Sequence, residues 1–105
     1  MSMTPAILHI LLSLAQADRH GLGIAADVKA FTNGRLALGP GTLYGTIKRM
    51  IASGLLEELD ERPDPEIDDE RRRYYRATPL GRAVLAAETA RMATLLGAAR
   101  AKRVR

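Results

Sequence analysis

GPGTLYGTIKRM, residues 39–50, is the stretch that decides the fold, because it reads as a short helix bounded by its own sequence. Pro40 suits the first helical position, where a missing N–H needs no partner, and Gly54 suits the position just past the end. One apolar stripe at helical spacing is formed by Leu43, Ile47 and Met50. The outward side chains, which can donate to DNA phosphates or base edges, are predicted to be Thr42, Tyr44, Lys48 and Arg49. An ordinary amphipathic surface helix with two cations near its C-terminus has the same pattern.

Two stretches with strand character follow this helix. The first covers residues 55–62, and a loop with Pro63 and Pro65 separates it from the second, residues 71–77. The second stretch, RRRYYRA, alternates and is rich in aromatic residues, as is typical of a strand. The two stretches therefore predict a β-hairpin directly after the helix.

The hairpin is predicted to have a buried and an exposed face. Because successive side chains of a strand point to opposite faces, Tyr75 is expected to pack inward with Ala77, and Tyr74 to lie on the other face. Glu57 and Glu58 on the first strand are placed to pair with the arginines of the second.

Three further helices are predicted. Thr4 as N-cap and Pro5 open one that runs to about residue 17, residues 23–31 form another, and Thr78 and Pro79 open one that runs to about residue 101. His20 is expected to be a turn or cap residue, Phe31 a core residue, and residues 35–38 a short strand. The fold class that follows is mainly α with a small β-hairpin wing: a winged helix-turn-helix plus a long C-terminal helix.

This order of elements resembles the PadR family of transcriptional regulators, over nearly the entire chain. The resemblance is carried, in order, by His20-Gly21, Pro40-Gly41-Thr42-Leu43-Tyr44, Gly54-Leu55-Leu56, Arg73-Tyr74-Tyr75-Arg76, and Thr78 with Gly81. The chain departs from the family where Leu22 replaces a frequent aromatic residue and Gly39 a frequent serine. Glycine is only a modest N-cap, so the start of the helix is expected to be less firmly held. The resemblance implies a dimeric regulator that binds DNA.

Composition agrees with a small regulator. A chain of 105 residues is expected to form one domain, and its core is modest because 47% of the residues are hydrophobic but only 4% aromatic. There is no cysteine, which excludes disulfides and cysteine-based zinc sites and fits a reducing cytoplasm. The only strongly apolar stretch, residues 7–15, is too short to span a bilayer and has no basic leader before it. We therefore expect a cytoplasmic protein without membrane contact.

Charge is segregated along the chain, whose formal net charge is +4. Seven acidic residues crowd the predicted hairpin loop: Asp60, Glu61, Asp64, Glu66, Asp68, Asp69 and Glu70. The chain after this loop contains a single acidic residue, Glu88, and is strongly cationic. Its basic residues are Arg71, Arg72, Arg73, Arg76, Arg82, Arg91, Arg100, Lys102, Arg103 and Arg105. A polyanionic partner such as double-stranded DNA follows from this excess, although basic residues that merely keep a dimer soluble are the alternative. The acidic loop would be repelled by phosphate, so we expect it to lie away from DNA, to be mobile, or to fold back onto the arginines.

Metal and catalytic chemistry are disfavoured. A calcium loop needs a glycine at its sharp turn, but prolines intrude here and no glycine lies between Gly54 and Gly81. His9 and His20 lack the context of a catalytic group, and the glycines match no phosphate-binding loop. We expect no metal, no cofactor and no enzymatic activity.

A homodimer is predicted from the first and last helices. The first is apolar over more than one face, and in the last Leu85, Met92 and Ala99 are spaced by sevens. The residues expected at the interface are Ile7, Leu8, Leu11, Leu85, Met92, Leu95, Leu96 and Ala99. The alternative for the first helix is that helices of the same chain surround it.

The sequence predicts three parts: a winged helix-turn-helix DNA-binding domain over residues 1–78, a dimerisation helix over 79–101 and a basic tail over 102–105. The expected function is a sequence-specific repressor that binds a palindromic operator as a homodimer. Its DNA contacts are expected from Pro40, Gly41, Thr42, Tyr44, Lys48, Arg49, Arg71, Arg72 and Arg73. Two alternatives stay open: a protein-interaction module, or a sensor that captures a small-molecule inducer between subunits near Met92 and Leu96.

Overall fold

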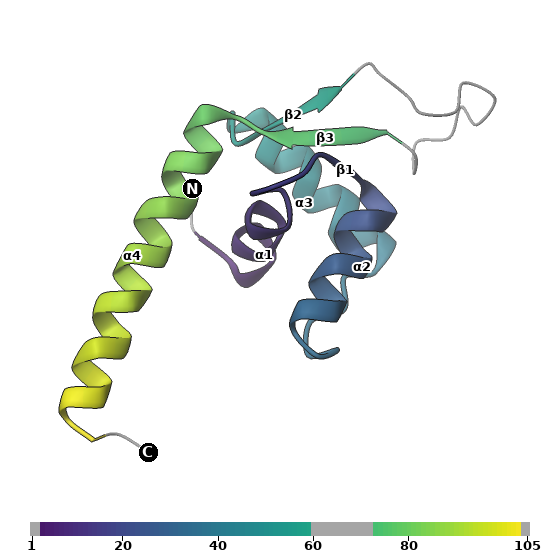
Figure 1. Cartoon of the computed structure of the whole chain (residues 1–105). Coiled ribbons are helices and arrows are strands. Elements are labelled where there is room, and N and C mark those ends of the chain that lie inside the picture. The colour runs from purple at the N-terminus through teal and green to yellow at the C-terminus, as the bar shows by residue number, and fades with distance from the viewer. Residues whose placement is uncertain (1–2, 60–72, 104–105) are drawn as a thin grey trace.

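A computed structural model describes residues 3–59 and 73–103, and within these residues the chain forms four helices and three short strands. Figure 1 shows three helices packed together beneath a small sheet, with a long fourth helix along one side. The elements are α1 (Pro5–Ser13), β1 (Arg19–His20), α2 (Gly21–Phe31), α3 (Pro40–Ala52), β2 (Leu56–Leu59), β3 (Tyr74–Ala77) and α4 (Pro79–Ala101). The predicted fold class is confirmed.

Three of the four helices begin with a side-chain cap. Thr4 accepts a hydrogen bond from the N–H of Ile7 at 3.2 Å, and Thr78 accepts one from the N–H of Gly81 at 3.0 Å. His20 caps α2, because its Nδ1 accepts from the N–H of Gly23 at 2.9 Å. The N-cap of α3 is Gly39, which provides no such bond, as the sequence predicted.

The strands form one antiparallel sheet with the order β1-β3-β2. Glu58 lies opposite Tyr75, and Leu56 lies opposite Ala77. Tyr75 and Ala77 are buried, which confirms the predicted inward face of β3. The prediction of a strand at residues 35–38 is wrong: these residues connect α2 to α3, and the third strand is β1. A two-residue strand leaves no periodic signal, because only pairing with the edge of β3 defines it.

The hydrophobic core lies between α1, α2, α3 and the sheet. Its fully buried side chains include Ile10, Leu11, Leu14, Ile24, Leu43 and Met50. α1 contacts α2, α3 and α4 of the same chain, which supports the alternative for most of its apolar surface, although Leu12 is 46% exposed. Ile7 and Leu11 lie in this core with 4% and 0% exposure, so they offer no surface to a second copy, contrary to expectation. Leu8 stays partly exposed.

Two details of the predicted helices were wrong. α1 ends at Ser13 rather than near residue 17, because Arg19 and Arg82 take up the carbonyls of Ser13 and Ala15 at 2.9 and 3.0 Å. Phe31 is 40% exposed and stacks on the ring of His9 with centroids 5.8 Å apart, instead of lying in the core. Its helical spacing was right, but α2 ends there, and no further element of the part of the chain that the structure describes covers the ring.

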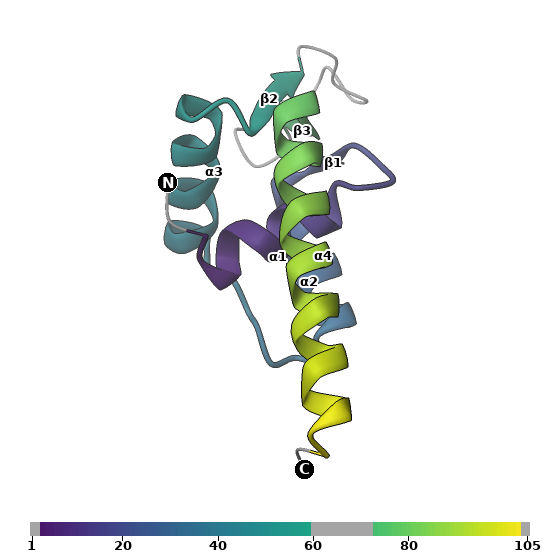
Figure 2. The same ribbon diagram turned by 90° about the vertical axis from the view of Figure 1, so that its left-hand side faces the viewer.

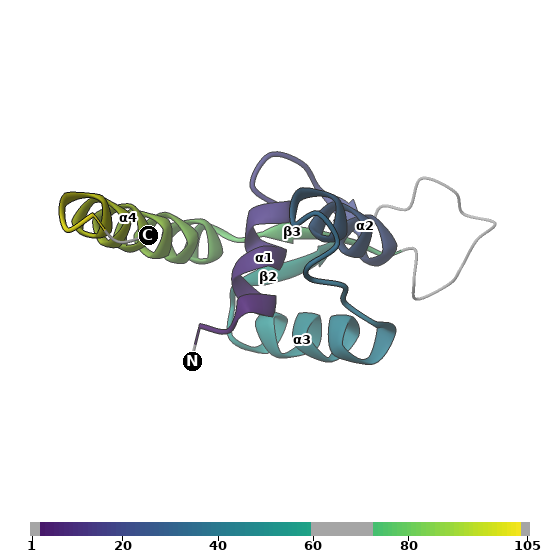
Figure 3. The same ribbon diagram turned by 90° about the horizontal axis from the view of Figure 1, so that it is seen from below.

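The whole molecule measures 56 × 28 × 22 Å along its principal axes, and α4 extends well beyond the other elements. Its first turns pack on the core through Val84 and Leu85. Figures 1 and 3 show its second half running clear of the other elements, and in Figure 2 it lies in front of them. No helix among the described residues combines the length and the apolar character needed to span a membrane.

Candidate nucleic-acid interface

α3 buries one side and exposes the other. Leu43, Ile47 and Met50 are 2% exposed or less, as predicted, and Thr46 is buried beside them. Pro40, Gly41, Thr42, Lys48 and Arg49 are exposed. Arg49 donates to the Oγ1 of Thr46 at 3.3 Å, so its guanidinium lies along its own helix. Figure 3 shows α3 at the surface of the molecule, with its outer side free of other described elements.

Tyr44 does not project outward, contrary to expectation. The side chain is half-buried and its hydroxyl is enclosed. Its ring lies against the start of α2: a Cβ at Gly21 would come within 2.5 Å of the Tyr44 hydroxyl. Tyr44 therefore braces α3 against α2, and this hydroxyl is not presented to solvent for contact with a base.

The hairpin carries an Arg–Glu pair on each face. Arg73 and Glu58 lie 3.2 Å apart on the face that contains Tyr75. On the other face Arg76 lies 3.7 Å from Glu57 and 3.0 Å from Asp18 of the α1–β1 loop. The predicted pairing of the two glutamates with arginines is confirmed. Arg71, Arg72 and the acidic residues 60–70 lie outside the described residues.

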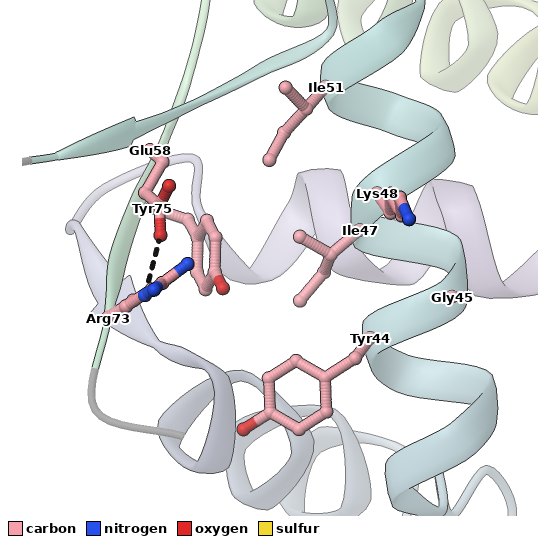
Figure 4. Close-up of a pocket in the computed structure, with 8 residues that line it drawn as sticks. All are labelled: Tyr44, Gly45, Ile47, Lys48, Ile51, Glu58, Arg73 and Tyr75. Atoms are coloured by element: carbon pink, nitrogen blue, oxygen red, sulfur yellow. Dashed lines mark ion pairs between the residues drawn. The ribbon is translucent and has the colours of Figure 1, made fainter. Parts of the chain in front are cut away.

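A groove of about 410 Å³ separates α3 from the hairpin. Figure 4 shows Tyr75, Glu58 and Arg73 on the hairpin opposite Tyr44, Ile47 and Ile51 on α3. Lys48 and Gly45 complete the lining from α3. The groove therefore has an apolar floor and charged rims, and it lies between the two elements that were predicted to contact DNA.

The structure also exposes a cation that sequence reasoning left out. Arg35 lies in the connection between α2 and α3 and is exposed. Sequence reasoning assigned Arg35 to a strand and therefore did not place it in the turn of the helix-turn-helix. A signal was present, because Asn33 and Gly34 end α2 in the left-handed conformation, with φ of 54° and 77°.

The profile of the transcriptional regulator PadR-like family matches residues 7–87 of the chain. The chain belongs to this family. The match covers the helices and strands described above and the first part of α4. The family is one of transcriptional regulators.

Two proteins of other organisms are similar to the chain in sequence. It is 38% identical over 78 residues to the transcriptional regulator Rv3488 of Mycobacterium tuberculosis (strain ATCC 25618 / H37Rv), covering 74% of this chain and 66% of that protein. It is 35% identical over 97 residues to an uncharacterized 37.1 kDa protein in transposon TN4556 of Streptomyces fradiae. That alignment covers 92% of this chain but 26% of the transposon protein, so the chain spans about a quarter of one relative and two thirds of the other.

Solved structures share the fold. A PadR family transcription regulator from hypervirulent Clostridium difficile R20291 superimposes with a TM-score of 0.74 at 22% identity, covering 92% of this chain and 96% of that one. A transcriptional regulator from Clostridium thermocellum has a TM-score of 0.70 at 23% identity, with coverages of 94% and 92%. At these identities the likeness establishes the architecture, including a comparable chain length.

The outer half of α4 is an apolar surface that nothing in the described residues covers. Met92, Leu95 and Leu96 are 42%, 65% and 50% exposed. Glu88 and Arg91 form an ion pair beside this surface. The hydrogen bond from the Arg91 guanidinium lowers the pKa of Glu88 and raises that of Arg91. Both groups are accessible to water, so the pair adds little stability.

A second groove, of about 280 Å³, lies between α1 and α4 and is mostly apolar. Leu11, Leu12 and Ala15 form one wall, and Leu85, Ala86 and Thr89 form the other. Met92 and Leu96, the residues considered for an inducer site, lie outside its lining. Among the described residues, no three His, Asp or Glu side chains gather as a metal site would require.

Proposed function

We propose that this PadR-like chain is a repressor that binds a palindromic operator as a homodimer. The observation that carries the proposal is the division of α3 into a buried apolar side and an exposed side with Thr42, Lys48 and Arg49. A surface helix with outward polar and cationic groups, next to an arginine-bearing hairpin, suits insertion into the major groove. Repression would then follow from occlusion of a promoter.

The dimer is proposed from the uncovered surface of α4. Leu95 and Leu96 are exposed to an extent that is unusual for adjacent leucines on a long helix. A second copy is the natural partner, because two α4 helices can bury the same stripe against each other about a two-fold axis. Such a dimer would present two α3 helices about 34 Å apart, one helical turn of DNA, and would therefore prefer a two-fold symmetric site.

Each α3 residue has a proposed role. Thr42 is a candidate for a phosphate or base-edge contact, and Lys48 and Arg49 are candidates for phosphate contacts. Pro40 and Gly41 would allow close approach of the backbone, because a Cβ at Gly41 would meet no neighbour within 4 Å. The hairpin arginines 71–73 would contact the DNA backbone or the minor groove. The proposed place of action is the cytoplasm.

Selection of bound duplexes from a random pool tests the proposal, followed by salt titrations with two lysine variants. We expect the wild type to enrich two-fold symmetric sequences. Lys48→Ala should weaken binding to the selected and to a random duplex alike, and should lower the logarithmic salt slope by about one. Lys102→Ala is the matched control: it removes the same charge just beyond the last turn of α4, and should leave the slope unchanged.

Three results would contradict the proposal. Failure of the wild type to bind any duplex at low salt would favour a protein-interaction module instead. Enrichment of sequences without two-fold symmetry would remove the palindromic operator. Equal effects of the two lysine variants would show that overall charge, rather than the outer side of α3, determines binding.

A further inference from the structure

The groove between α3 and the hairpin has a cation on each rim. Lys48 lines it from α3 and is exposed, and Arg73 lines it from the hairpin with 41% of its side chain exposed. Between these rims lie the side chains of Ile47 and Tyr75, which are almost completely buried. A groove with cations on both rims and an apolar floor matches a sugar–phosphate strand, whose charge lies outside and whose sugar is less polar.

The position of the groove agrees with this occupant. If α3 enters the major groove, the hairpin beside it reaches the adjoining minor groove. The DNA strand that separates these two grooves then lies opposite the space between α3 and the hairpin. Figure 4 shows this space with α3 on one side and the hairpin on the other.

Glu58 is the residue that does not fit a phosphate site. It lies directly opposite Tyr75 in the sheet, and its carboxylate reaches diagonally to the Nε of Arg73 at 3.2 Å. Since it is 38% exposed on the wall of the groove, its charge would repel a phosphate placed there. Glu57, the preceding residue, pairs with Arg76 on the opposite face of the hairpin.

We propose that Glu58 restrains DNA binding by holding Arg73 in an intramolecular ion pair, which a backbone phosphate must displace. The inference rests on the proposed DNA binding and adds to it a regulatory residue in the groove. In the free protein the carboxylate of Glu58 takes the place of a phosphate at Arg73. In the complex, Arg73 exchanges this carboxylate for a phosphate of the strand between the two grooves. The restraint acts on every sequence, because a phosphate contact does not distinguish bases.

The restraint is modest in size. Exposed ion pairs contribute up to about 1 kcal/mol, so release of Arg73 is expected to raise affinity by about two- to fivefold. A change of this size is measurable by fluorescence anisotropy with a short random-sequence duplex at several salt concentrations. A random duplex suffices, because the contact does not depend on base sequence.

The experiment compares Glu58→Gln with Glu57→Gln, and repeats Glu58→Gln in an Arg73→Gln background. Both glutamate variants remove one negative charge from the same exposed strand, but only Glu58 faces the groove. We expect Glu58→Gln to tighten binding more than Glu57→Gln by about two- to fivefold. We also expect that extra gain to shrink when Arg73 is replaced, because only the direct repulsion between Glu58 and phosphate is then relieved.

The remaining outcomes overturn the inference. Equal gains for the two glutamate variants would reduce the effect to net charge, and an extra gain that is undiminished without Arg73 would show that the ion pair plays no part. Weaker binding by Glu58→Gln would make Glu58 a positioning residue for Arg73 rather than a competitor. Failure of the wild type to bind the duplex at all would overturn the proposed function, and this inference with it.

Discussion

The side chain of Ser13 is a polar group whose burial lowers the stability of the fold. Its side chain is 3% exposed, and within the described residues its hydroxyl has no hydrogen-bond partner. A buried hydroxyl without a partner loses its bonds to water and gains nothing in return, which is unfavourable by about 1–3 kcal/mol. The backbone of Ser13 is used, since its carbonyl accepts from Arg19 at 2.9 Å, but the side chain contributes only its volume.

Ser13→Ala is therefore expected to stabilise the protein. The free energy of unfolding should rise by about 1 kcal/mol, because alanine removes the unsatisfied hydroxyl and leaves only a small void. Chemical denaturation monitored by circular dichroism measures the change. Ser53→Ala is the matched control, since Ser53 is exposed at the end of α3 and should have an effect near zero. A loss of stability in Ser13→Ala would show that this hydroxyl is bonded.

At the scale of elements, the end of α3 and the start of α4 form one joint. Gly54 ends α3 with a φ of 78°, and its carbonyl accepts a hydrogen bond from the hydroxyl of Thr78. The N–H of Thr78 donates to the carbonyl of Leu55 at 3.1 Å. Gly81, in the first turn of α4, approaches the same carbonyl so closely that a Cβ there would overlap it. The helix proposed to read DNA and the helix proposed to dimerise are therefore linked through backbone contacts.

Two glycines of α4 are expected to respond in opposite directions to the same substitution. Gly81→Ala should destabilise the protein by about 2–3 kcal/mol, because its Cβ would meet backbone that cannot move aside without opening the joint. Gly97→Ala should stabilise it by about 0.5–1 kcal/mol, because a Cβ at Gly97 meets nothing within 4 Å and alanine favours helix. Thermal and urea unfolding of both variants tests the pair. Destabilisation by Gly97→Ala would show that a partner's backbone approaches α4 at that point.

At the scale of the whole molecule, the chain is a compact domain with a long helix, α4, of which only the first half packs on the core. The core takes up the first turns of α4, whereas Met92, Leu95 and Leu96 stay exposed over its second half. The sequence of a helix contributes little to its stability when the helix does not pack on anything, since most helical stability in proteins comes from packing of an apolar face. The exposed second half of α4 is therefore the surface on which we expect a second copy to pack.

Leu95→Glu is expected to convert a dimer into a monomer. The wild type should sediment with twice the mass of the chain at micromolar concentration, and a charge at the most exposed leucine of α4 should prevent two such stripes from meeting. Ala90→Glu is the matched control, because Ala90 is exposed on the side of α4 away from the stripe and should leave the dimer intact. Analytical ultracentrifugation measures both. A wild type that remains monomeric at these concentrations would contradict the assembly.

Local signals were sufficient to predict that the four helices and the hairpin exist, although not where α1 ends. Helical spacing and a leading proline predicted the end of α3 to within two residues of the observed end. Alternation along β3 correctly predicted that Tyr75 and Ala77 point inward. Local signals failed where another element decides. Tyr44 was predicted to face outward, but Gly21 of α2 leaves room for its ring. Ile7 and Leu11 were predicted to meet a second copy, but neighbouring helices of the same chain cover them.

By itself, the sequence determined the order of the helices and the hairpin, the caps, the stripe on α3 and the family, because each depends on neighbouring residues or on a short motif. Only the tertiary structure decided which polar side chains reach solvent, which arginine each hairpin glutamate meets, and that β1 pairs with the edge of β3. These features depend on pairs of residues far apart in the chain, and no local period records such distances.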